Sequence, residues 1–180
     1  MDDPIDETIE AFEELKQEGV IRYYGISSIR PNVIREYVKR SNIVSVMSQY
    51  SILDSRPEEE VLPLLDEHGI SLIARGPLAK GILTDNGYAK ADNGFLDYTR
   101  EELLELHGKL ITLLDGGTNL TQTALRYPLS HPAVATVIPG ASTLHQLLHN
   151  IQAGDVQPLP PQVCEAIRRI SKPGRYAQHR

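Results

Sequence analysis

Apolar residues follow two alternating patterns along the chain, one with helical spacing and one in short continuous runs. Ile5, Ile9, Phe12 and Leu15 come first, and steps of three or four residues place side chains on one face of a helix. Beyond this helix, β-branched and aromatic runs of strand length are each followed by a segment with helical spacing. These runs predict strands over residues 20–26, 43–47, 70–74 and 134–138.

Helices are predicted between and after these strands. The predicted helical segments are 5–18, 31–40, 56–68, 99–113, 121–127, 144–151 and 160–170. Ser55 with Glu58, and Thr99 with Glu102, match the capping box that opens helices. Strands that alternate with helices indicate an α/β fold with a parallel sheet and right-handed crossovers. Residues 76–98 form a long connection, which is typical of a functional or mobile loop.

Composition narrows the class of protein. A chain of 180 residues is expected to form one domain, 1–180, with 172–180 as a frayed tail. The formal net charge of −6 disfavours nucleic acid as a partner. One cysteine, Cys164, excludes a disulfide framework and a cysteine-rich zinc site. No apolar run reaches the ~18 residues of a membrane span, and the start lacks a signal peptide's apolar stretch. We therefore expect a cytoplasmic protein without membrane contacts.

The carboxyl ends of the predicted strands carry the candidate chemistry, because ligands of parallel α/β folds bind there. The four ends are Gly25-Ile26-Ser27-Ser28, Met47-Ser48-Gln49-Tyr50, Ala74-Arg75-Gly76-Pro77-Leu78-Ala79-Lys80-Gly81 and Val137-Ile138-Pro139-Gly140-Ala141-Ser142. Hydroxyl and amide side chains suit a carboxamide ligand. Cations beside glycines, followed by a helix N-terminus, suit phosphate.

These four segments, in this order and spacing, resemble the C-terminal half of the aldo/keto reductase family, strands five to eight. Residues 72–83 and 137–150 resemble the segments around the seventh and eighth strands, and 19–28 and 48–50 those around the fifth and sixth. The resemblance implies half of an eight-stranded (β/α) barrel, which needs about 250 residues when complete. It also implies NAD(P)H-dependent reduction of aldehydes or ketones in the complete barrel.

The resemblance further implies a set of cofactor-binding residues. Ser27, Ser28 and Gln49 would hold the nicotinamide carboxamide, and Arg75 would stack on the ring or turn to the pyrophosphate. Gly76, Leu78 and Lys80 would line the pyrophosphate. The remaining candidates would surround the adenosine 2′-phosphate and the adenine: Gly140, Ala141, Ser142, Gln146, His149 and Asn150. The expected cofactor is NADP(H). NAD(H) is the alternative, because Ser142 stands where many members have an Arg, and the loss of that cation weakens the case for NADP over NAD.

The family's catalytic Asp, Tyr, Lys and His have no matching positions in this sequence, so no catalytic residue is assigned. The isolated chain is expected to be inactive and either to self-associate or to pair with a complementary half-barrel. The alternative is a non-catalytic nucleotide-binding or interaction module, from a truncated or decayed reductase.

Each candidate also has a structural interpretation. The polar strand-end residues could satisfy loop backbone, and Arg75 and Lys80 could be solvated charges. His145 and His149 lie four residues apart without a third ligand type, so no metal site is assigned. Tyr50 is best placed to replace the missing acid but is interpreted as structural, and the run Glu58-Glu59-Glu60 is interpreted as the first turn of a helix.

Overall fold

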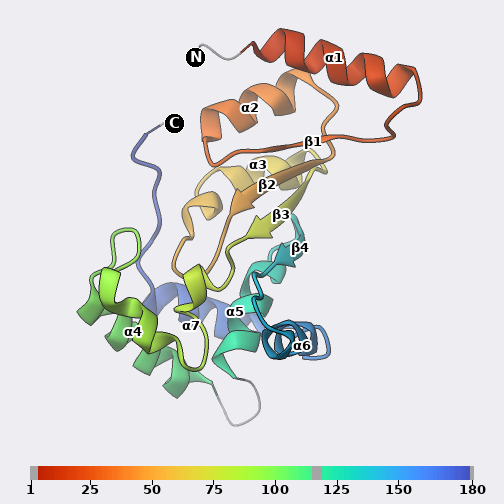
Figure 1. Ribbon diagram of the computed structural model, residues 1–180. Helices are drawn as coiled ribbons and strands as arrows, with labels where there is room; N and C mark the ends of the chain where they lie inside the picture. The colour runs from red at the N-terminus through yellow and green to blue at the C-terminus, as the bar shows by residue number, and fades with distance from the viewer. Residues whose placement is uncertain (1–3, 115–118, 179–180) are drawn as a thin grey trace.

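Four parallel strands form the centre of the protein in a computed structural model that describes residues 4–114 and 119–178 (Figure 1). The strands are β1 (Gly25–Ser27), β2 (Ser45–Gln49), β3 (Ser71–Arg75) and β4 (Val134–Ile138). They lie side by side in sequence order, and each pairs with the next in parallel. The predicted α/β class with a parallel sheet is confirmed.

Helices separate the strands along the chain. Their bounds are α1 (Ile5–Gln17), α2 (Pro31–Arg40), α3 (Val61–Glu67), α4 (Arg100–Leu113), α5 (Leu120–Leu129), α6 (Leu144–Gln152) and α7 (Pro161–Ile170). Short 3₁₀ helices, η1 (Arg56–Glu58), η2 (Ala79–Gly81) and η3 (Gly87–Asn93), interrupt the loops. Figure 1 shows α1 and α2 beside the β1 end of the sheet, and α5 and α6 beside the β4 end.

The two faces of the sheet differ in burial. Side chains alternate across a strand, and Val46, Ser48, Leu72 and Ala74 are fully buried on one face. The opposite face of β2 and β3 is only partly buried. We call this second face, which carries Met47, Gln49, Ile73 and Arg75, the open face. The hydrophobic core therefore lies on one side of the sheet.

The first strand is shorter than predicted. The β-branched and aromatic run predicts a strand over 20–26, whereas the ladder begins at Gly25. Val20 and Tyr23 are 66% and 70% exposed. Residues with a high strand propensity form a ladder only where a partner strand is present. At the edge of the sheet, β1 has β2 as its neighbour, and β2 pairs with three residues of β1. The next two strands run one or two residues further than predicted, so that Gln49 and Arg75 belong to the ladder.

One predicted capping box is confirmed and the other is wrong. Thr99 Oγ1 accepts a hydrogen bond from the Glu102 amide, and the Glu102 carboxylate accepts one from the Thr99 amide. Ser55 caps nothing with its side chain, and α3 begins only at Val61. The sequence also predicts Asp3 as the N-cap of the first helix and a helix break at Gly116-Gly117, and both positions lie outside the described residues.

Glu58 has tertiary partners instead of the predicted helical role. Its Oε1 accepts hydrogen bonds from the hydroxyls of Tyr50 and Tyr127, both at 2.7 Å, and Arg168 Nε donates to its Oε2 at 3.1 Å. These partners come from the end of β2, from α5 and from α7. Three long-range hydrogen bonds outweigh one local capping bond, which explains why the interpretation of Glu58-Glu59-Glu60 as a first helical turn is wrong.

Residues 172–178, which belong to the expected tail, form specific contacts with the rest of the protein. Lys172 Nζ contacts the Glu102 carboxylate at 2.6 Å, and its backbone amide donates to the Tyr98 hydroxyl. The Gly174 amide donates to Ser55 Oγ at 2.9 Å. Tyr176 is 6% exposed, and its burial raises the pKa of the phenol to about 12. These specific contacts hold the segment against the loop after β2 and against α4.

Apolar side chains remain exposed at the β4 end of the molecule. Helix α6 has its predicted extent, yet Leu144, Leu147, Leu148 and Ile151 are between 47% and 70% exposed. Ile138 at the end of β4 is 43% exposed. Across the described ranges, no helix combines the length and the apolar character that a membrane-spanning segment needs. The exposed apolar surface thus consists of side chains from α6, a short amphipathic helix, and from the end of β4 at the edge of the sheet.

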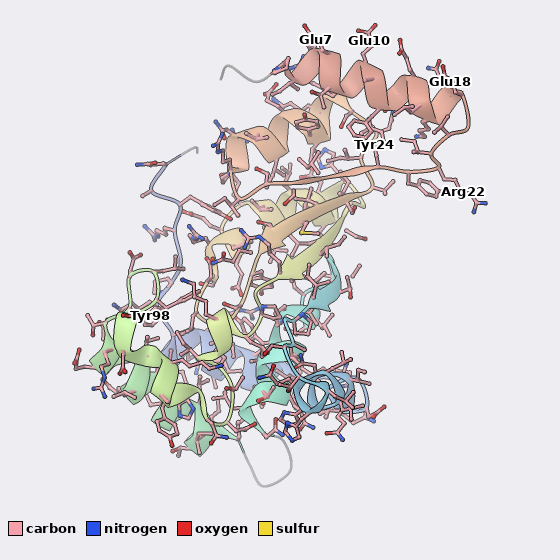
Figure 2. The ribbon with its side chains drawn as sticks, viewed as in Figure 1. Glu7, Glu10, Glu18, Arg22, Tyr24 and Tyr98 are labelled. Carbon is pink, nitrogen blue, oxygen red and sulfur yellow. The ribbon has the colours of Figure 1, made fainter. Side chains whose placement is uncertain are left out.

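We expect Glu58→Ala to destabilise the chain by at least about 2 kcal/mol, because it leaves two buried hydroxyls without an acceptor and each costs about 1–3 kcal/mol. Urea unfolding followed by circular dichroism measures the change. The control is Glu10→Ala on the outer side of α1 (Figure 2), which should stay within about 0.5 kcal/mol of the parent chain. Equal stability of the two variants would contradict the assigned role of Glu58.

Candidate functional site

The parallel register aligns polar residues at the carboxyl ends of the strands. Gln49 pairs with Arg75, and Arg75 pairs with Ile138 on the next strand. Paired residues of neighbouring parallel strands project from the same face, so Gln49 and Arg75 lie together on the open face. Arg75 Nη1 donates a hydrogen bond to Gln49 Oε1 at 3.0 Å. Two of the predicted site residues are thus in direct contact.

A carboxylate fixes the orientation of the Gln49 amide. Gln49 Nε2 donates to Asp54 Oδ2 at 2.7 Å. An ionised carboxylate only accepts and a guanidinium only donates, so the amide nitrogen must face Asp54 and the amide oxygen must face Arg75. Asp54 in turn accepts two hydrogen bonds from Arg56, at 2.6 and 2.7 Å. Asp54 and Arg56 are absent from the sequence-based predictions.

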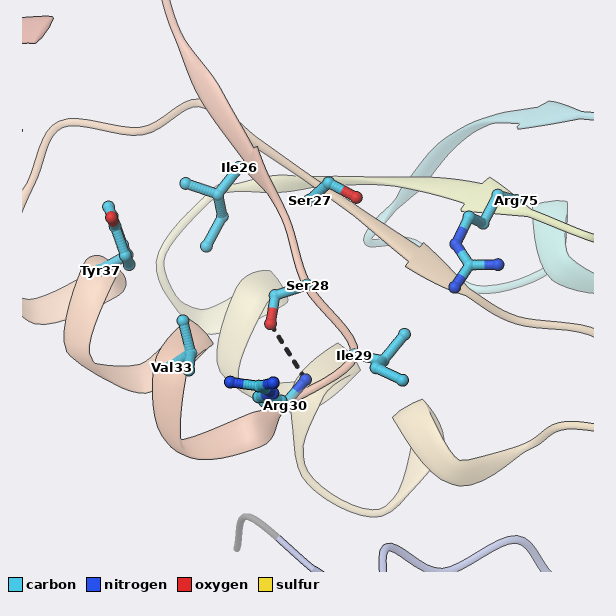
Figure 3. Close-up of a pocket in the computed structure, with 8 residues that line it drawn as sticks. All are labelled: Ile26, Ser27, Ser28, Ile29, Arg30, Val33, Tyr37 and Arg75. Carbon is cyan, nitrogen blue, oxygen red and sulfur yellow. Dashed lines mark hydrogen bonds between the residues drawn. The ribbon is translucent and has the colours of Figure 1, made fainter. Parts of the chain in front are cut away.

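A first cavity, of about 510 Å³, lies at the end of β1 (Figure 3). Ser27, Ser28 and Arg75 line it together with Val33 and Tyr37 of α2. The Ser28 hydroxyl accepts a hydrogen bond from the Arg30 amide at 3.0 Å and so already stabilises the turn that leads into α2. Ser27 is exposed. The two serines therefore share this cavity with Arg75, whereas Gln49 does not line it.

A larger cavity, of about 780 Å³, brings together the predicted residues that follow β3 and β4. We call it the groove. Nine predicted residues line it: Gly76, Leu78, Lys80, Gly140, Ala141, Ser142, Gln146, His149 and Asn150. A third cavity, of about 460 Å³, is lined by Gln49, Arg75, Gly76 and Lys80 and so joins the strand ends to the groove. The predicted residues therefore lie along one continuous path from β1 to α6.

The wall of the groove after β3 has an unusual backbone. Gly76 and Gly81 have φ values of +65° and +87°, and Ala79 and Lys80 have φ values of +46° and +58°. Positive φ is uncommon outside glycine and is often kept at sites that hold ligands. A Cβ on Gly81 would lie 2.5 Å from Lys90 Nζ, so the absence of a side chain at Gly81 lets a second cation approach the loop. Lys80 and Lys90 both line the groove.

The opposite wall of the groove is the start of α6. Thr143 caps the helix by accepting from the Gln146 amide. The amide and hydroxyl of Ser142 both donate to Gln146 Oε1, at 2.8 and 3.0 Å. Asn150 Nδ2 donates to the Gly140 carbonyl oxygen at 3.3 Å. These local bonds hold the segment after β4 against the helix, where the positive end of the helix dipole favours an anion.

The tautomer of His149 follows from its neighbour. Asn119 Oδ1 accepts from the Gln122 amide as an N-cap, which leaves Nδ2 to face His149 Nε2 at 3.0 Å. Nδ2 can only donate, so Nε2 accepts and the ring proton is on Nδ1. His145 lies beside His149, with ring centroids 6.2 Å apart. Among the residues that the structure describes, no group of three or more His, Cys, Asp or Glu side chains could hold a metal.

Asp85 is another groove residue that the sequence-based predictions do not contain. Its carboxylate accepts from the Leu120 amide at 3.0 Å and from Thr121 Oγ1 at 2.8 Å, at the start of α5. Asp85 and Thr121 both line the groove. Asp85 and Thr121 lie 36 residues apart in the sequence, so a local spacing pattern cannot predict the contact between them.

Tyr50 has the structural environment that the sequence analysis assigns to it. Tyr50 is fully buried, and burial, with Tyr127 and Glu58 adding to it, raises the pKa of its hydroxyl far above the ordinary value. Such a phenol lines none of the three cavities described above and gives up its proton with difficulty. Cys164 is also buried and forms no disulfide.

Comparison with known proteins identifies the class to which this fold and cleft belong. The model of the aldo/keto reductase family matches residues 1–172, and the chain belongs to that family. An uncharacterised oxidoreductase, YqkF, from Bacillus subtilis is 54% identical over 185 residues, which cover 100% of this chain and 60% of the relative. An NADH-specific methylglyoxal reductase from Escherichia coli is 31% identical over 165 residues, covering 83% of this chain and 49% of the relative.

The structural likeness agrees with the sequence likeness. The holo form of the aldo-keto reductase AKR11C1 from Bacillus halodurans superposes with a TM-score of 0.90 at 54% identity. The match covers 99% of this chain and 60% of that chain. The chain thus spans between about half and 60% of the length of these relatives. The expected family is confirmed.

Proposed function

We propose that this chain forms the nicotinamide-dinucleotide cleft of an aldo/keto reductase that reduces aldehydes or ketones to alcohols. The observation that carries the proposal is the groove, because nine of the predicted cofactor-binding residues line one cavity. Family membership supports an oxidoreductase. The proposed cofactor is NADP(H), with NAD(H) as the alternative, and the proposed setting is a single domain in the cytoplasm.

The chemistry of the groove fits the phosphates of a dinucleotide. Lys80 and Lys90 supply positive charge at the loop after β3, and glycines at positive φ let a ligand approach the backbone there. The start of α6 offers Ser142 and the positive end of the helix dipole to the 2′-phosphate. Asn119 fixes His149 for contact with the adenine. The groove is therefore suited to an extended anionic ligand although the whole chain carries a net charge of −6.

The strand ends of β1 to β3 fit the nicotinamide end of the ligand. Ser27, Gln49 and Arg75 offer a hydroxyl, an amide and a guanidinium that can bind a carboxamide and a neighbouring ring. The dinucleotide, when bound, supplies the hydride that reduces the carbonyl carbon. The residues of this chain hold and orient the ligand, and the neighbouring apolar side chains Phe95 and Leu96 limit water in the cavity beside Gln49.

Protonation of the substrate oxygen is proposed to need residues other than the ones described above. The family's acid has no matching position in this sequence, and Tyr50 is buried against Glu58. The open face, the free edges of β1 and β4, and the exposed apolar residues of α6 suit a further protein surface. We propose that a second copy or a complementary half-barrel covers them.

Nicotinamide dinucleotides should bind weakly, with NADPH binding no worse than NADH, because one side of the cleft is open to water. Lys80→Ala should weaken NADPH binding by about tenfold, or about 1.4 kcal/mol, through the loss of one phosphate contact. Fluorescence titration measures both. Lys109→Ala, which removes an exposed cation of α4 paired with Glu105, is the control and should change nothing. Absence of saturation into the millimolar range for either nucleotide would end the proposal.

The chain should self-associate at concentrations of tens of micromolar. Unpaired strand edges and exposed apolar side chains favour pairing with another chain. Light scattering gives the mass, and a double variant with Leu144→Lys and Leu148→Lys should shift the distribution toward the monomer. A stable monomer that binds no hydrophobic dye would contradict this expectation.

The chain alone should not oxidise NADPH with a reactive aromatic aldehyde. General acid catalysis contributes roughly 10²–10⁴-fold, and stabilisation of the developing oxyanion roughly a further 10²–10³-fold. Absorbance of NADPH is followed for the chain alone and for its mixture with a matching first half-barrel. Turnover by the mixture only would support the proposal. Turnover by the chain alone that is abolished by Tyr50→Phe would refute it and identify a different acid.

A further inference from the structure

Asp54 is a buried carboxylate that links the strand-end amide of Gln49 to the guanidinium of Arg56. Its side chain is 0% exposed, and its two oxygens accept from Gln49 and twice from Arg56. Its backbone amide donates to Ser51, which closes the loop after β2. A buried carboxylate with a bidentate guanidinium partner is held in one geometry. The position of Asp54 is therefore set before any ligand binds.

From this geometry we infer that Asp54 is a positioning residue, which presents the oxygen of the Gln49 amide, and not its nitrogen, to the carboxamide of a nicotinamide dinucleotide. The inference rests on the proposed function and assigns a determinant of ligand specificity within it. Because Asp54 only accepts, one N–H of Gln49 Nε2 is committed to it. This bond turns Gln49 Oε1 toward Arg75 and the strand ends, where a ligand N–H can donate to it.

Arg75 supports this assignment because it occupies the place of a ligand donor. Its Nη1 donates to Gln49 Oε1 at 3.0 Å, as the N–H of a carboxamide would. Arg75 lines both cavities at the strand ends, so its side chain lies between them. When it turns away to stack on the ring or to reach the pyrophosphate, it leaves an oriented acceptor behind. A ligand group without an N–H cannot form a hydrogen bond with this oxygen.

The C-terminal segment holds the other side of Asp54. The guanidinium carbon of Arg56 lies 5.1 Å from the centroid of the Tyr176 ring, and Gly174 is bonded to Ser55 beside it. A Cβ on Gly174 would lie 2.5 Å from the Arg56 amide nitrogen, so the chain passes close to this loop. Arg56 is thus held between Tyr176 and Asp54, which limits the movement of the carboxylate.

The test compares NADPH with its 3-acetylpyridine analogue, which keeps the carbonyl oxygen but lacks the carboxamide N–H. The chain should bind NADPH more tightly than the analogue by about tenfold, the ratio expected for one hydrogen bond of about 1.4 kcal/mol. In Asp54→Asn the neutral amide can donate as well as accept, so Gln49 can turn over and donate to the acetyl oxygen. The ratio should fall to about one. The control is Asp66→Asn, an exposed carboxylate of α3, which should keep the ratio of the parent chain.

Binding of 2′-phospho-ADP-ribose, which has no nicotinamide, separates this inference from the proposed function. It should be equal in the parent chain and in Asp54→Asn. The inference would be overturned if the parent chain and Asp54→Asn showed the same preference for NADPH over the analogue. It would also be overturned if the parent chain bound 2′-phospho-ADP-ribose but showed no preference for NADPH. In both cases the proposed function of the groove stands. If the parent chain bound none of the three ligands, the inference and the proposed function would both be overturned.

If Asp54→Asn fails to fold, Arg56→Lys, which keeps the charge but loses the bidentate contact, is tested instead. A partial loss of discrimination supports the inference, and an unchanged ratio overturns it.

Discussion

The register of the parallel sheet is the constraint on which the rest of the site depends. It pairs Gln49 with Arg75 and Arg75 with Ile138, so the chain reaches Gly76 and Gly140 at the same edge of the sheet. A shift of one residue between β2 and β3 would send Arg75 to the buried face, beside Val46 and Ser48 of β2, and would move Leu72 and Ala74 to the open face. The core prevents such a shift, because only small or apolar side chains fit on the buried face of β2 and β3. On both strands these side chains alternate with the residues of the open face. Packing on one face therefore positions the polar residues of the other.

Two polar networks then connect the sheet to distant parts of the chain. Glu58 joins the end of β2 to α5 and α7 through Tyr50, Tyr127 and Arg168. Asp54 joins the same loop to the strand-end amide and, through Arg56, to the C-terminal segment. Both carboxylates lie in the loop after β2, only four residues apart. This loop is therefore the point at which the core, the C-terminal segment and the candidate ligand site are coupled.

The sequence predicts well what depends on neighbouring residues. The bounds of β4 and α2 follow from apolar patterning, and the Thr99–Glu102 capping box follows from two residues three positions apart. The candidate ligand residues at the strand ends follow from a rule about parallel sheets and from the resemblance to a family. Glu58, Asp85 and the C-terminal segment could not be predicted in this way. Asp85 and Thr121 lie 36 residues apart, Glu58 and Tyr127 lie 69 apart, and Ser55 and Gly174 lie 119 apart. Only the fold brings these residues together.

The contrast between Ser55 and Thr99 shows why a local signal fails where a long-range partner competes. Both residues have an acidic residue three positions later, yet only Thr99 forms the box. Glu102 is partly exposed, and its other partner, Lys172, leaves its capping bond intact. Glu58 instead faces two buried tyrosine hydroxyls that would otherwise lack an acceptor, and an unmet hydroxyl in the interior costs more than an uncapped helix end in contact with water. The burial of Tyr50 and Tyr127 therefore decides the conformation of residues 55–60, and with it the path of the loop that carries Asp54 to Gln49.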